Sequence, residues 1–280
     1  MKNLGYYNGK YDELEKMTVP MLDRACYFGD GVYDATYCRN YVIYALDEHI
    51  DRFYASAALL DIHIPHTKEE LKGILCELVK KLDDGSQFVY IQASRGTGLR
   101  NHAYEEGGKA NIWIMLKPQA PKDTYRRAKL ITLEDRRFLY CNIKTLNLIP
   151  SVLYTEAAVK AGCDEAVLHR GDRVTECAHS NVSILKDGVL KTAPADEYIL
   201  AGVARAHLIE MCRRFGVPVE EVPFTVSEMM GADEVIVTSS SLVCFAAEEI
   251  DGKPVGGRAP ALLRQLQDAL VKDFLEKTSL

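Results

Sequence analysis

Short runs rich in β-branched and aromatic residues alternate along the chain with segments in which apolar residues recur every three or four positions. The runs predict strands, and the helical spacing predicts amphipathic helices. The dipeptide Asn8-Gly9 marks a turn directly after a first strand. The other predicted strands are Val32–Tyr37, Tyr41–Leu46, Phe88–Ser94, Asn111–Leu116, Ala128–Leu133, Glu165–His169, Val182–Leu185, Val189–Thr192 and Glu234–Thr238.

Polar residues at the start of the periodic segments predict where the helices begin. Asp47 is expected to cap a helix that continues to Leu60. Thr67 with Glu70 forms a capping box for a helix that continues to Leu82. The pattern predicts two later helices, Val203–Phe215 and Pro260–Glu276.

The stretch from Tyr140 to Gly162 organises the rest of the chain. Cys141–Thr145 looks extended, Asn147–Pro150 predicts a turn, and a helix of about a dozen residues follows. Proline suits the first helical turn because its missing N–H is not needed there, and Gly162 is expected to end the helix. The predicted apolar face of this helix consists of Val152, Leu153, Ala157 and Val159.

Lys144 lies in this stretch among apolar neighbours, which include Ile143, Leu146 and Leu148. An amine in apolar surroundings loses part of its tendency to ionise and becomes a nucleophile towards carbonyl groups. The alternative is an ordinary lysine at a strand edge with its ammonium group in water. The other motifs of the chain favour the nucleophile.

The 280 residues suffice for two domains. The segment Lys117–Asp123 is polar, contains two prolines and lacks periodicity, which is typical of a linker. We therefore place a linker at 119–123, between an N-terminal domain of residues 1–118 and a C-terminal domain of residues 124–280.

Composition excludes several classes of protein. The net charge is −6 and no basic stripe dominates any segment, which argues against nucleic-acid binding. The chain shows no apolar signal core and no apolar run long enough for a membrane span. The eight cysteines are scattered and form no C-x-x-C pair. This pattern predicts reduced thiols in a cytoplasmic protein, with no metal site and no disulfide frame.

Three segments have the composition of anion-binding elements. The loop Arg95–His102 combines glycines with clustered cations, and Gly202 leaves the N–H groups of a helix start open to a phosphate. The run Thr238–Ser241 places hydroxyl groups at a strand end. Arg52 lies between core positions of its helix, and from that helix alone it is a surface residue.

Taken together, these segments resemble the fold-type IV pyridoxal-phosphate enzymes, the class IV aminotransferase family. Within that family the resemblance is greatest to bacterial D-amino-acid aminotransferases. The resemblance implies an α/β (α+β) fold with a smaller N-terminal domain and a larger C-terminal domain that contains a mixed sheet or pseudo-barrel. The matching motifs, in family order, are DRACYFGDGVYD, LDEHIDRFYAS, SRGTGLRNH, NIKTLNLIPSVL, DEAVLHR, VTE, SN, ILAGVARAHL and VTSSS.

The resemblance implies a role for each matching residue around the cofactor, pyridoxal 5'-phosphate. Lys144 stands at the family's Schiff-base lysine, and Glu176 at the glutamate that pairs with the pyridine nitrogen. A carboxylate there keeps the ring protonated, so that the ring accepts electrons from the substrate. The remaining cofactor-binding positions are Arg52 for the phosphate, Leu200 against the ring face, and Val203, Ala204, Ser180 and Ser240.

The resemblance also implies a carboxylate site for the substrate. Tyr33, Arg100 and His102 match the residues that bind the α-carboxylate in D-amino-acid aminotransferases. The family supplies the arginine and the histidine from the partner subunit, so a homodimer is expected. The expected activity is transfer of an amino group from a D-amino acid such as D-alanine to a 2-oxo acid.

Three positions depart from the family pattern. After the glutamate the family has G-S-S-S-N, whereas this chain has Cys177-Ala178-His179-Ser180-Asn181, so that His179 replaces a serine. The helix start is Gly202-Val203-Ala204-Arg205 in place of G-I-T-R, which removes one hydroxyl near the phosphate. Leu99 replaces the proline that precedes the arginine. These departures affect the assignment of the substrate more than the assignment of the cofactor.

Three other activities therefore stay open. A branched-chain L-amino-acid aminotransferase does not usually carry the Arg100-x-His102 pair. An aminodeoxychorismate lyase, which breaks a carbon–oxygen bond and releases pyruvate, is favoured by the Thr175-Glu176-Cys177 context. A member that binds the cofactor without turnover is disfavoured, because the lysine, the glutamate and Arg52 are all retained.

Overall fold

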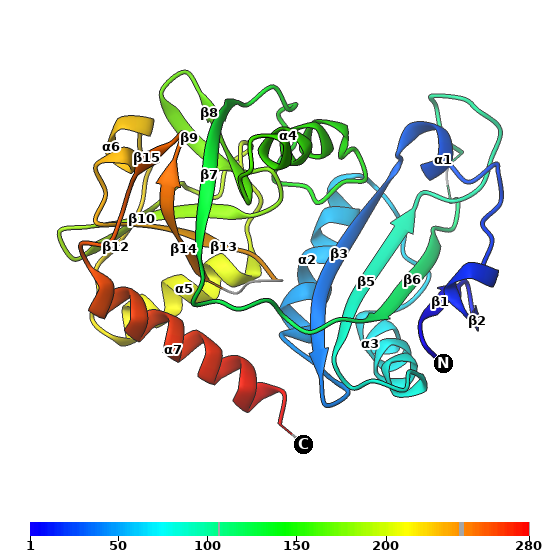
Figure 1. Cartoon of the computed structure of the whole chain (residues 1–280). Helices are drawn as coiled ribbons and strands as arrows, with labels where there is room; N and C mark the ends of the chain where they lie inside the picture. Colours follow the sequence, from blue (N-terminus) through cyan, green and yellow to red (C-terminus); the bar gives the residue numbers. More distant parts are fainter. Residues whose placement is uncertain (106, 241–243, 280) are drawn as a thin grey trace. The chain divides into compact units, whose positions relative to one another are not determined.

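The computed structural model describes residues 1–105, 107–240 and 244–279 (Figure 1). The described chain divides into two compact units. Unit 1 consists of Met1–Pro121, Ile143–Asn147 and the residues from Phe274 onward, and unit 2 consists of Lys122–Asn142 and Leu148–Asp273. Lys144 therefore belongs to unit 1. The domain boundaries at 1–118 and 124–280, with a linker at 119–123, stay a prediction.

Unit 1 is built on a six-stranded sheet in the order β2-β1-β6-β5-β3-β4, and each neighbouring pair is antiparallel. Its strands are β1 (Leu4–Tyr7), β2 (Lys10–Asp12), β3 (Gly31–Arg39), β4 (Val42–Ile43), β5 (Gln87–Ser94) and β6 (Asn111–Pro118). Its helices are η1 (Leu14–Lys16), α1 (Ala25–Phe28), α2 (Leu46–Leu59), α3 (Lys68–Leu78) and η2 (Val79–Lys81).

The core of unit 1 lies between the sheet and helices α2 and α3 (Figure 1). Phe53 and Ile50 of α2 and Leu71 and Leu75 of α3 are buried in one cluster with residues of β5 and β6. The turn at Asn8-Gly9 and the capping box of Thr67 and Glu70 are confirmed.

The start of α2 differs from the sequence-based expectation. The residue before the helix is Ala45, in a left-handed conformation (φ 50°), and Asp47 lies inside the first turn. The β4 strand covers only Val42–Ile43, because the chain turns into the helix before the predicted strand end at Leu46. Asp47 still suits its place, since a carboxylate in the first turn interacts favourably with the helix dipole.

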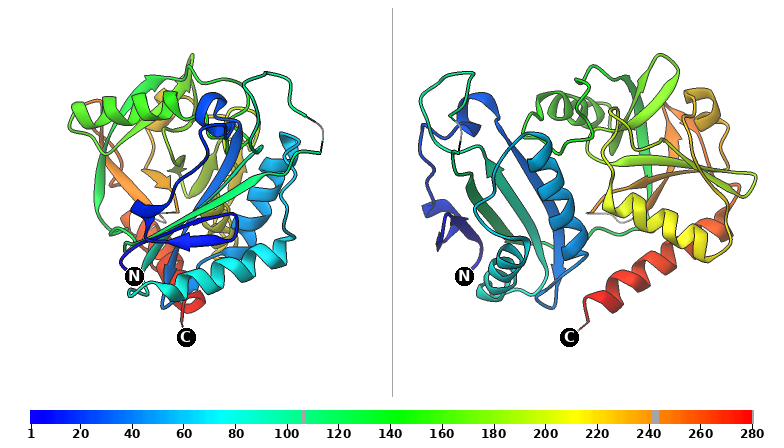
Figure 2. Two further views of the ribbon diagram at one scale, coloured as in Figure 1. Left: turned by 90° about the vertical axis from the view of Figure 1, so that its right-hand side faces the viewer. Right: turned by 180° about the vertical axis from the view of Figure 1, so that it is seen from behind.

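Unit 2 is built on a nine-stranded curled sheet (Figure 2). Its main path is β12-β11-β10-β13-β14-β7-β8-β9, and β15 pairs with β14. The strands are β7 (Arg127–Glu134), β8 (Glu165–Arg170), β9 (Arg173–Cys177), β10 (Asn181–Lys186), β11 (Val189–Thr192), β12 (Val219–Glu221), β13 (Glu234–Thr238), β14 (Phe245–Ile250) and β15 (Lys253–Pro254). The helices are α4 (Ile149–Lys160), α5 (Val203–Arg214), α6 (Val226–Met230) and α7 (Pro260–Lys277), of which α7 belongs to unit 2 as far as Asp273.

Two apolar clusters hold this sheet in its curled form. One cluster lies among residues of β7, β10, β13 and β14 and includes Phe224 and Phe245. The other joins helices α5 and α7 to the sheet through residues such as Leu208 and Leu266. Three pairs of strands are parallel, β11 with β12, β14 with β7 and β7 with β8, and they make the sheet mixed. The expected mixed α/β fold with a curled sheet is confirmed.

The apolar face predicted for the 149–160 helix is wrong. Val152, Leu153 and Val159 of α4 are 59%, 64% and 62% exposed, whereas Ala158 on the other side is fully buried against β8. The helix packs on its sheet with small and polar side chains, which leaves its largest apolar residues at the surface of the single chain. An exposed apolar stripe of this kind is typical of a protein–protein interface.

The segment before α4 forms no named strand, contrary to the expectation of an extended run at Cys141–Thr145. Only one isolated bridge joins Thr145 to Val32. Pro150 lies in the first turn of α4, as expected, and Gly162 follows the helix end in a left-handed conformation (φ 70°).

Within the described ranges, no helix is long and apolar enough to cross a membrane. The eight cysteines all lie in those ranges, and each has a free thiol. Ser241, the last hydroxyl of the Thr238–Ser241 run, lies outside the described residues.

Candidate active site

Hydrogen bonds to two elements of unit 1 fix the backbone around Lys144. The Lys144 carbonyl accepts from the Tyr33 N–H of β3 at 2.9 Å, and the Lys144 N–H donates to Ser56 Oγ of α2 at 3.2 Å. Position 31 of β3 requires a glycine, because a Cβ there would lie 2.5 Å from the backbone carbonyl oxygen of Ala93 on β5 and 2.7 Å from the Leu146 side chain. The Lys144 ammonium then lies 4.2 Å from the centre of the Tyr33 ring. Two predicted site residues, Lys144 and Tyr33, are thus neighbours.

A buried carboxylate lies next to this pair. Asp34 is fully buried on β3, and both of its oxygens accept hydrogen bonds from Arg52 at 2.8 Å. His49 Nδ1 lies 2.7 Å from the same carboxylate. His49 and Arg52 stand three residues apart on α2, so they face Asp34 together. The third predicted site residue of this unit, Arg52, is therefore held in place and is not a surface side chain.

Burial and charge have opposite effects in this cluster. Burial alone would raise the pKa of Asp34, but the Arg52 guanidinium and then His49 outweigh it and hold that pKa well below its usual range. Burial lowers the pKa of His49 and outweighs the attraction of Asp34, and the charges of Arg52 and Lys144 lower it further. At neutral pH the cluster therefore contains an ionised Asp34 and a neutral His49.

Arg52→Ala is expected to weaken cofactor binding and also to destabilise the apoprotein, because it removes the arginine partner of the buried Asp34. Breaking a buried ion pair in this way costs about 3–5 kcal/mol. Arg52→Lys retains a cation but not the forked geometry, so it should keep more of the stability while losing cofactor affinity. Thermal unfolding of the apoproteins and titration with cofactor measure the two effects. If both variants bind the cofactor as tightly as the wild type, Arg52 does not hold it.

Glu176, near the end of β9, contacts another predicted cofactor residue, Leu200. Its carboxylate is buried and is paired with Arg137. Its Oε2 accepts from the Leu200 N–H and from Asn181 Nδ2, each at 3.0 Å. Asn181 also donates to the Leu200 carbonyl at 2.9 Å. Glu176 and Leu200 are therefore brought together, and Asn181 fixes their relative position.

Arg137 links Glu176 to a second acid. It pairs with Asp135 at 2.9 Å, and the Asp135 carboxylate is fully buried. Burial lowers the pKa of Arg137, but Asp135 and Glu176 outweigh it and raise that pKa. A permanently charged arginine therefore lies beside Glu176 and favours its ionised form.

The N-terminus of α5 has the properties of a phosphate site. Helix α5 begins at Val203 after Gly202, and Gly202 has no side chain that could cap its first N–H groups. A Cβ at Gly202 would lie 2.0 Å from Asn181 Oδ1, so only glycine fits there. The Val203 and Ala204 N–H groups begin this helix without a side-chain cap from Gly202, and a helix start of this kind favours an anion. The chemistry of this donor set fits the phosphate of the cofactor that the resemblance implies.

A nearby orphan hydroxyl supports a polar ligand in unit 2. Thr238 at the end of β13 is opposite Asn181 in the strand register. Its Oγ1 is buried and has no hydrogen-bond partner in the part of the chain that the structure describes. Ser240 is half-buried shortly after this strand end. Its contact with the cofactor stays a prediction.

Ser180 is turned towards another carboxylate. Its Oγ donates to Glu165 at 2.6 Å, and His179 Nδ1 lies 2.7 Å from the same group. Burial would raise the pKa of Glu165, but His179 and Ser180 hold it below its usual value. The residue that replaces a family serine, His179, is therefore paired with a buried acid. The cofactor contact of Ser180 remains a prediction.

Arg100 and His102 form a separate cluster in unit 1, on the ring of Phe28. The Arg100 guanidinium lies 5.1 Å from the centre of that ring, and the His102 ring lies 5.0 Å from it. The structure thus brings together the two residues that the resemblance assigns to a partner's carboxylate site.

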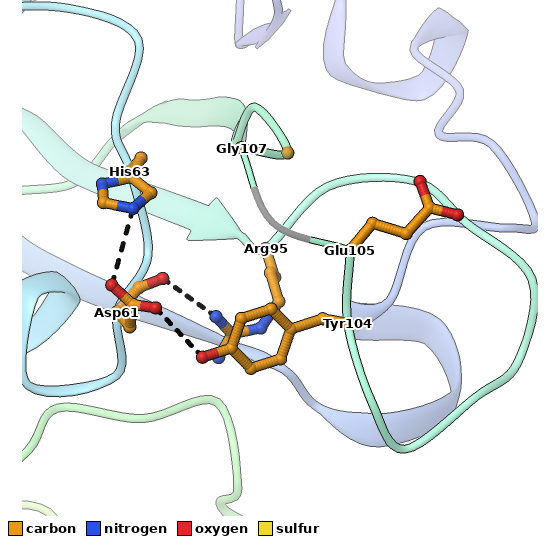
Figure 3. Close-up of a pocket in the computed structure, with 7 residues that line it drawn as sticks. Asp61, His63, Arg95, Tyr104, Glu105 and Gly107 are labelled. Atoms are coloured by element: carbon orange, nitrogen blue, oxygen red, sulfur yellow. Dashed lines mark hydrogen bonds and ion pairs between the residues drawn. The ribbon is translucent and has the colours of Figure 1, made fainter.

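A polar cavity of about 300 Å³ lies at the other end of the same loop (Figure 3). Tyr104 donates to Asp61 at 3.0 Å, and its ring stacks on Arg95 at 3.9 Å. His63 pairs with the same aspartate at 3.5 Å. These side chains already pair with one another, and no metal-binding cluster is found among the described residues. Arg95, where the loop begins, is held beside this cavity by the Tyr104 ring and by hydrogen bonds to the Leu60 and Asp61 carbonyls.

Sequence reasoning missed Asp34, His49 and Arg137. Asp34 gave a signal, because an acid inside the apolar run 31–37 needs a buried partner. His49 stands at helical spacing from Arg52, but that spacing does not identify its partner. Arg137 had no signal, since its partners are contributed by β9 and by its own loop.

Comparison with known proteins agrees with this set of residues. The family model described as "Amino-transferase class IV" matches residues 31–250. The chain is 38% identical to the D-alanine aminotransferase of Listeria monocytogenes serotype 4b (strain F2365), over 96% of this chain and 95% of that protein. It is 36% identical to the D-alanine aminotransferase of Bacillus licheniformis, over 98% of each.

A solved structure agrees with the fold. It is the T.th. branched-chain amino acid aminotransferase, complexed with N-(5'-phosphopyridoxyl)-L-glutamate. The TM-score is 0.89 at 26% identity, over 98% of this chain and 94% of that chain. The chain therefore belongs to the class IV aminotransferases, and it is a pyridoxal-phosphate-dependent enzyme of fold type IV that acts on amino acids and 2-oxo acids.

Proposed function

We propose that the enzyme transfers the amino group of a D-amino acid similar to D-alanine to a 2-oxo acid. The observation that carries this proposal is the pair Arg100 and His102, held together on one aromatic ring. An arginine binds a carboxylate by two parallel N–H···O bonds, and a histidine adds a donor. The curated relatives named above are D-alanine aminotransferases that cover nearly the whole chain.

The chain's own residues divide the remaining work. Pyridoxal phosphate, when bound, supplies the electron sink for the reaction. Lys144 provides the amine that holds the cofactor and moves the α-proton of the substrate. Glu176, charged beside Arg137, keeps the cofactor ring protonated. Arg52 in unit 1 and, independently, the start of α5 in unit 2 are each assigned to phosphate binding, as the family resemblance implies.

The hand of the substrate follows from the side on which its carboxylate is held. If the carboxylate is fixed by Arg100 and His102 and the α-proton faces Lys144, the side chain has one direction left. Binding the carboxylate on the opposite side would select the other hand. The proposed D-specificity therefore depends on Arg100 more than on any residue that holds the cofactor.

The test is the half-reaction with paired D- and L-amino acids. We expect wild-type enzyme to convert D-alanine faster than L-valine, and Arg100→Ala to raise KM for D-alanine by about ten- to hundredfold, since a charge-assisted hydrogen bond is worth about 1.5–3 kcal/mol. Cofactor absorbance should be unchanged. Arg136→Ala, which removes an exposed arginine, is the matched control. A preference for L-valine, or indifference of the Arg100 variant, would replace this proposal by branched-chain transamination.

The lyase alternative, which rests on the Thr175-Glu176-Cys177 context, gains no reactive thiol from the structure. Cys177, which suggested it, is fully buried, and burial raises the pKa of its thiol well above the usual value. Such a thiol is not ionised at neutral pH and supplies no reactive group.

We also propose that the enzyme is a homodimer in which Arg100 and His102 serve the partner's site. The exposed apolar stripe of α4 supports an interface, and an apolar surface with few charges suits a second copy of the same chain. The eight free cysteines support a reducing, cytoplasmic location.

Subunit mixing tests the shared site. A Lys144→Ala subunit combined with an Arg100→Ala subunit contains one intact site only if the arginine acts across the interface. Recovery of activity on mixing and refolding the two variants supports this arrangement. No recovery, with mixed dimers present, assigns Arg100 to its own subunit.

A further inference from the structure

The ring of Phe28 is the centre of a cluster of positively charged and aromatic side chains in unit 1. The Arg24 guanidinium lies 4.8 Å from the ring centre, and Arg100 lies 5.1 Å from it. The His102 ring lies 5.0 Å away, inclined by 51°. The face of an aromatic ring attracts cations through its quadrupole. The half-buried Phe28 side chain thus contacts both residues that are proposed to bind the substrate carboxylate, Arg100 and His102.

The backbone of Phe28 is itself fixed. Helix α1 ends at Gly29 in a left-handed conformation (φ 61°), which a residue with a Cβ rarely adopts. The Gly29 carbonyl accepts from Asn147 Nδ2 at 3.1 Å. Asn147 belongs to the same short segment as Lys144. The ring is therefore tied to the segment that carries the reactive amine.

The loop that carries Arg100 is bound to the same element. Arg24 Nη1 donates to the Asn101 carbonyl at 2.8 Å, and the Arg24 N–H donates to the Gly96 carbonyl at 2.9 Å. The Tyr27 hydroxyl donates to the Gly98 carbonyl. These bonds hold the backbone on both sides of Arg100, and the ring of Phe28 then orients the exposed side chain.

Charge explains why a ring is suited to this position. Arg24 is neutralised by Asp30 at 2.7 Å, and the same aspartate pairs with Arg95 at 2.9 Å. A carboxylate in place of Phe28 would also hold Arg100, but it would cancel the charge that a substrate carboxylate needs. The aromatic face of Phe28 restrains the Arg100 guanidinium without neutralising its positive charge, which therefore remains available to bind a substrate carboxylate.

We infer that Phe28 is a positioning residue for the substrate-carboxylate site, which it forms by orienting Arg100 and His102. This inference rests on the proposed function. Phe28 thereby becomes a specificity residue that acts indirectly. It affects the binding of amino acids and 2-oxo acids by orienting Arg100 and His102. The chemistry at Lys144 should not depend on it.

The experiment uses the holoenzyme with Phe28→Leu, which keeps an apolar side chain but removes the ring, and Phe28→Tyr, which keeps the ring. We expect Phe28→Leu to raise KM for D-alanine by about five- to thirtyfold, the value of two cation–ring contacts, with kcat within about twofold. Phe28→Tyr should restore KM. Phe88→Leu is the matched control, because Phe88 also lies under a cation, Lys117 at 5.2 Å.

A second comparison separates this inference from the proposed function. In an Arg100→Ala background, Phe28→Leu should change KM by less than about threefold, because coupled residues are not additive. An equal effect in both backgrounds would overturn the inference, since Phe28 would then act on its own. If Arg100→Ala alone leaves KM unchanged, the proposed carboxylate site itself fails. Should Phe28→Leu not fold, Phe28→Met provides the same comparison.

Discussion

Replacing Lys144 with alanine is expected to abolish transamination, by at least about four orders of magnitude in kcat, as removal of a nucleophile does in other enzymes. The reason is geometric as well as chemical. The Lys144 backbone is bonded to β3 and to α2, and its ammonium lies over the Tyr33 ring. No other lysine of the chain stands in the NIKTLN context.

Two measurements check this result. Borohydride reduction followed by denaturing gel filtration should leave cofactor on the wild type and none on Lys144→Ala. Lys191→Ala is the matched control, since Lys191 is a half-buried lysine paired with Glu228 in unit 2. A Lys144 variant that transaminates at the wild-type rate would show that another amine performs the reaction.

Replacing Glu176 with glutamine is expected to lower kcat by about ten- to hundredfold, because a charge-assisted hydrogen bond of about 1.5–3 kcal/mol is lost. Glutamine has the same shape, but a neutral amide does not hold a proton on the cofactor ring. The change also removes one of the two acids that flank Arg137 and leaves it paired with Asp135, at 2.9 Å. We therefore expect some loss of stability together with the loss of rate.

A second buried glutamate separates the two effects. Glu234 is fully buried, pairs with Arg127 at 3.2 Å and accepts from the Ala259 N–H. Glu234→Gln should lower the melting temperature without lowering kcat at saturating cofactor. If Glu176→Gln behaves in the same way, with a lower melting temperature and an unchanged kcat, Glu176 has a structural role. The proton on the cofactor ring is then held by another group.

Local signals in the sequence predicted local structure well. The capping box at Thr67, the turn at Asn8-Gly9 and Pro150 at a helix start depend on neighbouring residues only, so the chain specifies them wherever they occur. The cap at Asp47 was wrong for a related reason. Ala45 takes a left-handed conformation that its own side chain does not favour, and the surrounding structure imposes it.

Long-range pairing was not visible in the same way. The roles of Asp34, His49 and Arg137 depend on partners that lie far away in the sequence. The order of residues along the chain does not show which distant elements pack against one another. The apolar stripe of α4 shows another limit. Helical periodicity identifies a face, but it does not say whether the face is covered by the same chain.

The order in which the chain enters unit 1 bears on how the protein is synthesised. Ile143–Asn147 and the residues from Phe274 onward belong to unit 1, although most of that unit precedes Pro121. Arg39 and Asn40 donate to the Thr278 carbonyl, and the Tyr44 ring contacts Phe274. On the ribosome, which releases the N-terminus first, unit 1 waits for the residues from Phe274 to Thr278 before these contacts form. A fragment of residues 1–121 should therefore lack the lysine segment and the helix residues that follow Asp273, and folding of unit 1 is coupled to synthesis of these later segments.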